Sequence, residues 1–335
     1  MIDLIQILLT ALHLTSVNAA FGGPILALWL DFRRTRRADP VADALGRRLL
    51  RVSLHGLYGG ALFGAISAWL WWSSHPTEVS AAARSLPVSR YYFAVAELVF
   101  SAVCFEAWLR LWRHGGRRTI LGRFLAVAAI TNTVYHFPTL FAVLSVLSTR
   151  PDEANGAVRF VRYLADPEVL ARVGHFAAAS LAVGGAILAT LAASVTSRAV
   201  GSDDGIADSA ARLARRGGLI ALVATVLQWP IGIVVVLQLP EISRNALIGE
   251  SMSATLLFGV SLTAVVVLMH RLAAAAFGET TPSEVRSVLL WLGLTIMLMT
   301  AVRHYSREPL YSRQVAAVPS CPSLTGNFIY GIGRS

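Results

Sequence analysis

The chain has 335 residues, of which 55% are hydrophobic and 14% are charged, and its mean hydropathy is +0.61. This composition excludes a soluble domain with an ordinary core and is typical of a polytopic membrane protein. The formal net charge is +10. Basic residues of membrane proteins gather in cytoplasmic loops beside lipid headgroups, so this charge does not indicate nucleic-acid binding.

Eight apolar segments are long enough to span a bilayer, which takes about 20 helical residues. We therefore expect an all-α transmembrane bundle over residues 1–310, with no inserted soluble domain, and a tail over 311–335 that contains Cys321. The N-terminus lacks a basic region and a small-residue cleavage site, so we expect the first segment to be retained rather than removed as a signal peptide. The expected spans are 3–31, 47–73, 90–112, 119–148, 168–196, 217–239, 250–275 and 284–304.

The placement of arginine predicts the orientation of these spans. All 29 basic residues are arginines, and most of them fall in the connections after the odd-numbered spans. Positively charged connections stay in the cytoplasm. We therefore expect both termini outside the cytoplasmic membrane of a bacterium, with the tail on the extracytoplasmic side.

This orientation places five polar or ligand-forming residues in the outer half of the membrane, each on a different span. They are His13, Glu97, His175, Met252 and His304. Scattered packing residues would not be expected to agree in depth, so the agreement indicates a shared site. The other intramembrane histidines, whose roles stay open, are His55, His136 and His270.

Histidine and methionine are axial ligands of haem iron, and helix bundles build haem sites from facing helices. His13, His175 and His304 could each supply an axial nitrogen, and Met252 could supply a thioether opposite His175. For each histidine the alternative is a hydrogen-bonded packing role, and for Met252 it is that of an apolar filler. The chain has no Cys-x-x-Cys-His motif, so covalent c-type attachment is not expected.

The last span ends in a polar run. Arg307 lies three residues after His304, near the same helix face, and its guanidinium suits a haem propionate. The alternative for Arg307 is a solvated arginine at the membrane rim. Pro309 is expected to end the helix just beyond.

Two carboxylates lie on the third span, where an acidic residue indicates a proton relay or a counter-charge. A helix turns by about 100° per residue, so Glu97 and Glu106 are expected to face opposite sides. We expect Glu97 to serve an outer haem and Glu106 to admit protons from the cytoplasm. The alternative for Glu106 is an ion pair with Arg110, four residues on. The run Gly22, Gly23 and Pro24 and the Gly59-Gly60 pair are expected to allow close helix packing or a kink and to carry no chemistry.

Residues 302–310 read Val-Arg-His-Tyr-Ser-Arg-Glu-Pro-Leu. This run resembles the run ending Glu-x-Gly-Arg-Gln-Pro-Trp in the large subunit, subunit I, of cytochrome bd oxidases. By this resemblance His304 stands at the family's glutamate ligand of the high-spin b haem, and Arg307 stands at its arginine. The run Val-Gly-His-Phe-Ala-Ala-Ala-Ser from 173 is similar to the family's Val-His-Thr-Val-Ala-Ser-Gly-Tyr, which puts His175 at the ligand of the low-spin haem.

The resemblance covers residues 5–310 in order. His13 matches the family's ligand of the oxygen-binding haem, and Glu97 with Trp108 resembles its glutamate and tryptophan at the same spacing. The departures are specific: the long quinol-binding loop after the sixth span is replaced by about a dozen residues, and a ninth helix is missing. Met252 fits the family's methionine ligand only loosely. The family's third helix also has an earlier glutamate, which falls near Ser89 in this sequence and is missing here.

The resemblance implies a haem-binding membrane subunit of a cytochrome bd-like respiratory oxidoreductase. Electrons would come from an extracytoplasmic donor, a c-type cytochrome or another redox subunit rather than quinol, and reduction of O2 to water is left open. The implied cofactor is haem of b type, with d type as an alternative, in up to three copies. The implied partner is a second membrane subunit of similar architecture.

Two alternative functions stay open. The first is an electron-transfer or scaffold haem subunit of a larger respiratory complex, without O2 reduction. The second is a cofactor-free transporter or assembly protein, although the sequence shows no inverted repeat with Gly- or Pro-broken helices in matching halves. Whether the chain is itself an enzyme depends on which of these holds.

Overall fold

The computed structural model describes residues 2–74, 81–112, 114, 117–150, 153, 160–199, 204–278 and 281–317. Eight of its helices are long and apolar enough to cross a membrane. Three short elements, α7 (Phe160–Tyr163), α10 (Glu241–Asn245) and the π-helical turn η1 (Ala246–Glu250), lie between them. The long helices are α1 (Ile2–Arg37), α2 (Pro40–Ser74), α4 (Val88–Leu111), α5 (Arg117–Leu147), α8 (Pro167–Ala199), α9 (Asp204–Leu237), α11 (Met252–Phe277) and α12 (Pro282–Ala317).

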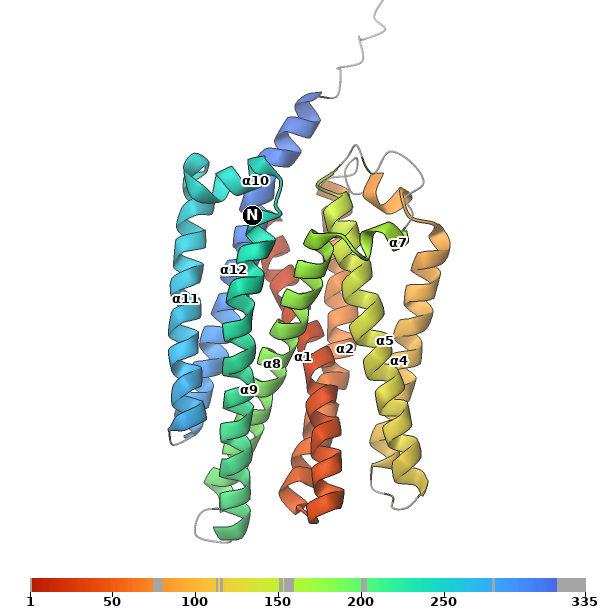
Figure 1. The fold of residues 1–335 in the computed structure, drawn as a ribbon, viewed down its shortest axis with the longest axis vertical. Coiled ribbons are helices and arrows are strands. Elements are labelled where there is room, and N and C mark those ends of the chain that lie inside the picture. The colour runs from red at the N-terminus through yellow and green to blue at the C-terminus, as the bar shows by residue number, and fades with distance from the viewer. Residues whose placement is uncertain are drawn as a thin grey trace, which may run out of the picture.

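This architecture confirms the expected all-α polytopic membrane fold. The long helices run up and down in one bundle, with α4 and α5 at one edge, α11 and α12 at the other, and α1 and α8 between them (Figure 1). The start of α1 and the far end of α12 lie at the same end of the bundle, as an even number of spans requires (Figure 1). That this end faces outward stays a prediction from the arginine count.

Several helices are longer than the apolar segments predicted. α2 begins at Pro40 rather than 47, and α9 begins at Asp204 rather than 217. The polar ends of these helices continue beyond the apolar window because a helix satisfies its own backbone in water as well as in lipid.

The expectation that Pro309 ends the last helix is wrong. α12 passes through Pro309 and continues to Ala317. A proline removes one backbone hydrogen bond, but neighbouring helices can hold such a turn in place. Here Arg303 and Arg307, both just before the proline, bond to Ser145 of α5 and anchor the turn.

Glycines let α1 lie directly against its neighbours. A Cβ at Gly22 would come within 1.8 Å of the Ser180 carbonyl oxygen on α8, and one at Gly184 within 2.8 Å of the Gly22 carbonyl carbon. A Cβ at Gly60 of α2 would approach the Val17 side chain to 2.8 Å. Close packing is therefore found at Gly22 and Gly60 and fixes α1 between α2 and α8, whereas a Cβ at Gly59 would remain 3.7 Å from its nearest neighbour.

We expect Gly22→Ala to destabilise the bundle by about 1–3 kcal/mol, because the added methyl must force α1 and α8 apart. Thermal unfolding of the purified protein in detergent measures this effect. Gly259→Ala on α11 is the matched control, since a Cβ there would meet nothing within 4 Å, and it should be neutral or slightly stabilising. Equal melting temperatures for the two variants would contradict the close α1–α8 contact.

Candidate functional site

His13 is held by the neighbouring helix α2. Its Nδ1 lies 2.8 Å from the Gly60 carbonyl oxygen. A carbonyl only accepts, so Nδ1 carries the proton and Nε2 is left with its lone pair. The ring also lies against Gly64, where a Cβ would come within 2.7 Å of it. α2 thus sets both the tautomer and the orientation of this imidazole, as the second partner of a metal-binding histidine does.

His175 lies on α8, which packs against both α1 and α9. Its Nδ1 is buried, and in the part of the chain that the structure describes it has no hydrogen-bond partner. The facing position on α9 is Gly232, where even a Cβ would remain 4.0 Å from the ring. A buried ring nitrogen without a partner is costly, so this imidazole is a candidate to contact a bound group.

His304 and Met252 are placed differently. His304 Nε2 lies 3.6 Å from Asp3 Oδ1, which turns this imidazole toward the first turn of α1. Met252 begins α11, and its residue surface is 75% exposed. α11 packs mainly against α9 and α12. The ligand roles of both residues stay predictions.

Three arginines converge on one hydroxyl. Ser145 of α5 accepts from Arg172 Nη1 at 3.4 Å, from Arg303 Nη2 at 3.3 Å and from Arg307 Nη2 at 2.8 Å. The arginines come from α8 and α12, so this group, called here the arginine triad, joins three helices. Arg307 is only 5% exposed, which rules out the alternative of a solvated rim arginine.

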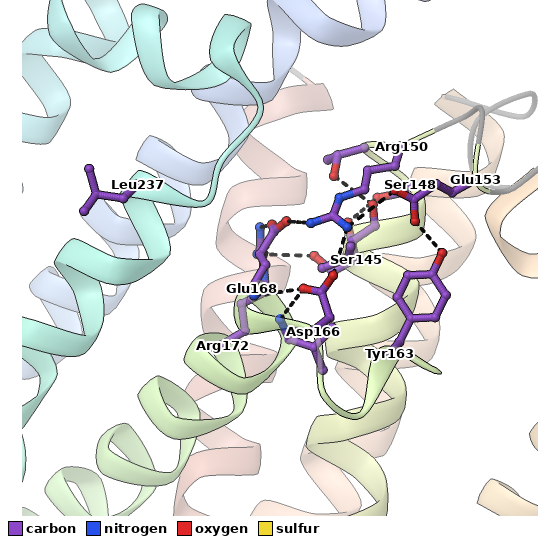
Figure 2. A network of polar contacts seen from close by, with 12 residues as sticks. Ser145, Ser148, Arg150, Glu153, Tyr163, Asp166, Glu168, Arg172 and Leu237 are labelled. Carbon is purple, nitrogen blue, oxygen red and sulfur yellow. Dashed lines mark hydrogen bonds and ion pairs between the residues drawn. The ribbon is translucent and has the colours of Figure 1, made fainter. Parts of the chain in front are cut away.

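Two acidic partners of this region, Glu168 and Asp166, lie at the start of α8 (Figure 2). Glu168 is fully buried and accepts from Arg172 Nε at 3.0 Å and from Arg150 Nη2 at 2.8 Å. Asp166 accepts from Arg150 Nη1 at 2.9 Å and from the backbone N–H groups of Glu168 and Val169, which it caps. These bonds tie the start of α8 to the end of α5.

Asp166 and Tyr163, at this end of the bundle, have shifted pKa values. Burial opposes the charge of Asp166, but the Arg150 hydrogen bond and the two capping N–H groups outweigh it and hold the pKa of this carboxyl below its usual range. Burial and a hydrogen bond donated to Glu153 raise the pKa of Tyr163 to about 12. At neutral pH Asp166 is therefore ionised and Tyr163 is a neutral donor.

Two members of the arginine triad, Arg172 and Arg307, repel each other, and the acid beside them is shared. Glu168 is shared between Arg172 and Arg150, and among the described residues Arg307 bonds only to the Ser145 hydroxyl. Guanidinium groups that meet at one hydroxyl repel each other, and burial strengthens the repulsion. An anion bound beside Ser145 would relieve it, and the guanidinium forks suit a carboxylate or a phosphate.

Two arginines of the triad lie close enough to histidines to act on them electrostatically. Arg303 acts electrostatically on His13, and Arg172 acts on His175. The sequence reasoning overlooked Arg172, Arg303 and Ser145. Helical spacing was the signal that could have found the two arginines. Arg172 lies three residues before His175, and Arg303 lies four residues before Arg307.

The two carboxylates of α4 face different helices, as their spacing predicted. Glu97 Oε1 lies 2.9 Å from His136 Nδ1 on α5. Glu106 accepts from the Tyr58 hydroxyl of α2 at 3.2 Å. No ion pair joins Glu106 to Arg110 in the described ranges. Both carboxylates thus have partners, and the proton-carrying roles proposed for them stay predictions.

His136 is half-exposed beside Glu97, with the rings of Phe93 and Tyr135 edge-on to it at 5.9 Å and 4.9 Å. His55 and His270 are exposed on the bundle surface. Within the residues described, no cluster of three or more His, Cys, Asp or Glu side chains could hold a bare metal ion. Haem iron needs only one or two protein ligands, so this finding does not bear on haem.

Comparison with protein-family models finds no match to this chain. Comparison with curated proteins also finds no match. The likeness to cytochrome bd subunit I therefore rests on the residues and motifs quoted above.

Proposed function

We propose that this chain is a haem-binding membrane subunit of a cytochrome bd-like respiratory oxidoreductase in the inner membrane of a bacterium. The observation that carries the proposal is the combination of His175, whose buried Nδ1 lacks a partner in the described residues, with the mutually repelling Arg172 and Arg307, which meet at Ser145. Haem matches both features, because it joins an iron that takes imidazole ligands to two propionate anions.

His13 and His175 are the proposed axial ligands. Gly60 fixes the tautomer of His13 and keeps Nε2 available. Arg172, Arg303 and Arg307 are proposed to neutralise the propionates, and Ser145 holds these guanidinium groups together. His304 is kept as a third proposed ligand, although its Nε2 lies beside Asp3. Bound haem would supply a one-electron redox centre within the bundle.

The connection between α9 and α11 bears on the electron donor. It consists of the short α10 and the turn η1, in which Gly249 has a φ of 133°. This compact connection replaces the long loop that holds quinol in the family that the sequence resembles. We therefore propose a c-type cytochrome or another redox subunit as the donor, beside a second membrane subunit of similar architecture.

One observation favours a second candidate, an electron-transfer or scaffold subunit that does not reduce O2. Reduction of O2 to water consumes protons, and the carboxylates proposed to carry them, Glu97 and Glu106, contact His136 and Tyr58. Within the described residues neither carboxylate contacts His13 or His175. A bundle that carries electrons alone would need no such contact.

A pyridine haemochrome assay with a carbon monoxide difference spectrum tests both candidates. We expect the purified protein to show a Soret band and a b-type haemochrome. A carbon monoxide shift of the reduced spectrum would indicate an open iron position and support the oxidase, whereas its absence would support the electron-transfer subunit. A protein purified from haem-replete cells without any Soret band would overturn the haem proposal and leave a cofactor-free transporter or assembly protein.

A further inference from the structure

A pocket lies at the opposite end of the bundle from the arginine triad. Its volume is about 420 Å³, and it opens between the end of α1, the start of α2 and the first turns of α9. Arg33 and Arg37 line it from α1, Asp39 from the α1–α2 turn, and Ser209 and Arg212 from α9. The arginine count assigns this end of the bundle to the cytoplasm.

The floor of the pocket is rigid. Asp39 accepts from Arg33 Nε at 2.8 Å and caps α2 through the N–H groups of Val41 and Ala42 at 3.0 and 3.1 Å. The Ser209 hydroxyl of α9 donates to the same carboxylate at 3.2 Å. These bonds neutralise Asp39 and join α9 to the α1–α2 turn. The one acid of the pocket lining is therefore already satisfied.

The remaining charge of the pocket is positive. Arg37 and Arg212 are exposed, and among the described residues neither forms an ion pair, even though Asp208 lies four residues before Arg212 on α9. Gly205, in the first turn of α9, lines the pocket without a side chain. Two guanidinium groups, from α1 and α9, therefore line one cavity.

A neighbouring aromatic contact agrees with headgroup depth for the pocket. Trp29, two turns before Arg37 on α1, has the Arg216 guanidinium of α9 over its ring, 5.8 Å from the ring centroid. Tryptophan gathers at the boundary between hydrocarbon and headgroups. The pocket lies on the polar side of this contact, where the phosphates of a bilayer lie.

We propose that this pocket binds the phosphate of an anionic phospholipid from the leaflet at this end of the bundle. Arg37 and Arg212 would hold the phosphate oxygens, which suit guanidinium donors. Basic pockets between transmembrane helices bind anionic headgroups by this chemistry. The site is independent of haem, and it would clamp α9 to the α1–α2 turn in an anionic membrane.

Native mass spectrometry of the delipidated full chain tests the proposal, with phosphatidylglycerol and phosphatidylcholine as probes. We expect phosphatidylglycerol to bind more tightly, and Arg37→Ala with Arg212→Ala to weaken its binding about 10- to 30-fold, since each arginine at a headgroup contributes roughly a factor of five. Arg117→Ala with Arg118→Ala is the matched control, because both are exposed arginines at the same end outside the pocket. That pair should change the affinity less than about twofold.

Three results would overturn the proposal. They are equal losses in the two arginine pairs, equal binding of the two lipids, and displacement of phosphatidylglycerol by an equimolar amount of inorganic phosphate. The last result would assign the pocket to free phosphate instead of lipid. Circular dichroism of both double variants checks that the helices are intact.

Discussion

Replacing His175 with alanine is expected to lower the haem content of the purified protein by about one equivalent. The imidazole is buried on α8, its Nδ1 has no hydrogen-bond partner in the described part of the chain, and Arg172 lies one turn away. If this ring ligates iron, Gly232, which faces it from α9, offers no side chain to replace it. The haem-to-protein ratio from a pyridine haemochrome assay measures the loss, and His13→Ala should give a loss of the same kind.

His270→Ala is the matched control for the ligand variants. His270 is an exposed histidine of α11 and should keep the full haem content. Added imidazole provides a sharper test, because it can enter the space left at position 175 and restore a low-spin spectrum only if the lost side chain was a ligand. Full haem content in His175→Ala and His13→Ala would remove both from the ligand set.

The eight spans could be predicted from the sequence because lipid leaves little choice of structure. A backbone in hydrocarbon must satisfy its own hydrogen bonds, so each long apolar segment becomes a helix. The helix ends could not be predicted in the same way. The start of α9 at Asp204 and the passage of α12 through Pro309 lie in polar sequence, where packing against other helices decides how far a helix continues.

The candidate site could be predicted only in part. Shared depth in the membrane singled out five residues, and of these the structure gives His13 and His175 distinctive environments. Ser145 could not be predicted, because one serine near the end of an apolar helix has no local signal. Its importance arises only when α8 and α12 bring their arginines to the same point on α5.

Glu168→Gln is expected to destabilise the fold by about 3–5 kcal/mol, which is the cost of leaving buried cations without their acid. Glutamine keeps nearly the same shape and an acceptor oxygen but loses the charge. Arg172 would then lie beside Arg307 with no carboxylate to offset their repulsion. Arg150 would keep only Glu153 and Asp166, which are more exposed than Glu168. Denaturant or thermal unfolding in detergent measures the change.

Glu153→Gln is the control for this prediction, because Glu153 belongs to the same network but its side chain is 46% exposed, and exposed ion pairs contribute about 0–1 kcal/mol. A double-mutant cycle then separates charge from packing. If charge imbalance is the cause, adding Arg172→Gln to Glu168→Gln should restore part of the lost stability, because both members of the pair become neutral. If the two losses simply add, the buried pair is not coupled. The repulsion between Arg172 and Arg307, on which the proposed anion site rests, would then lose its main support.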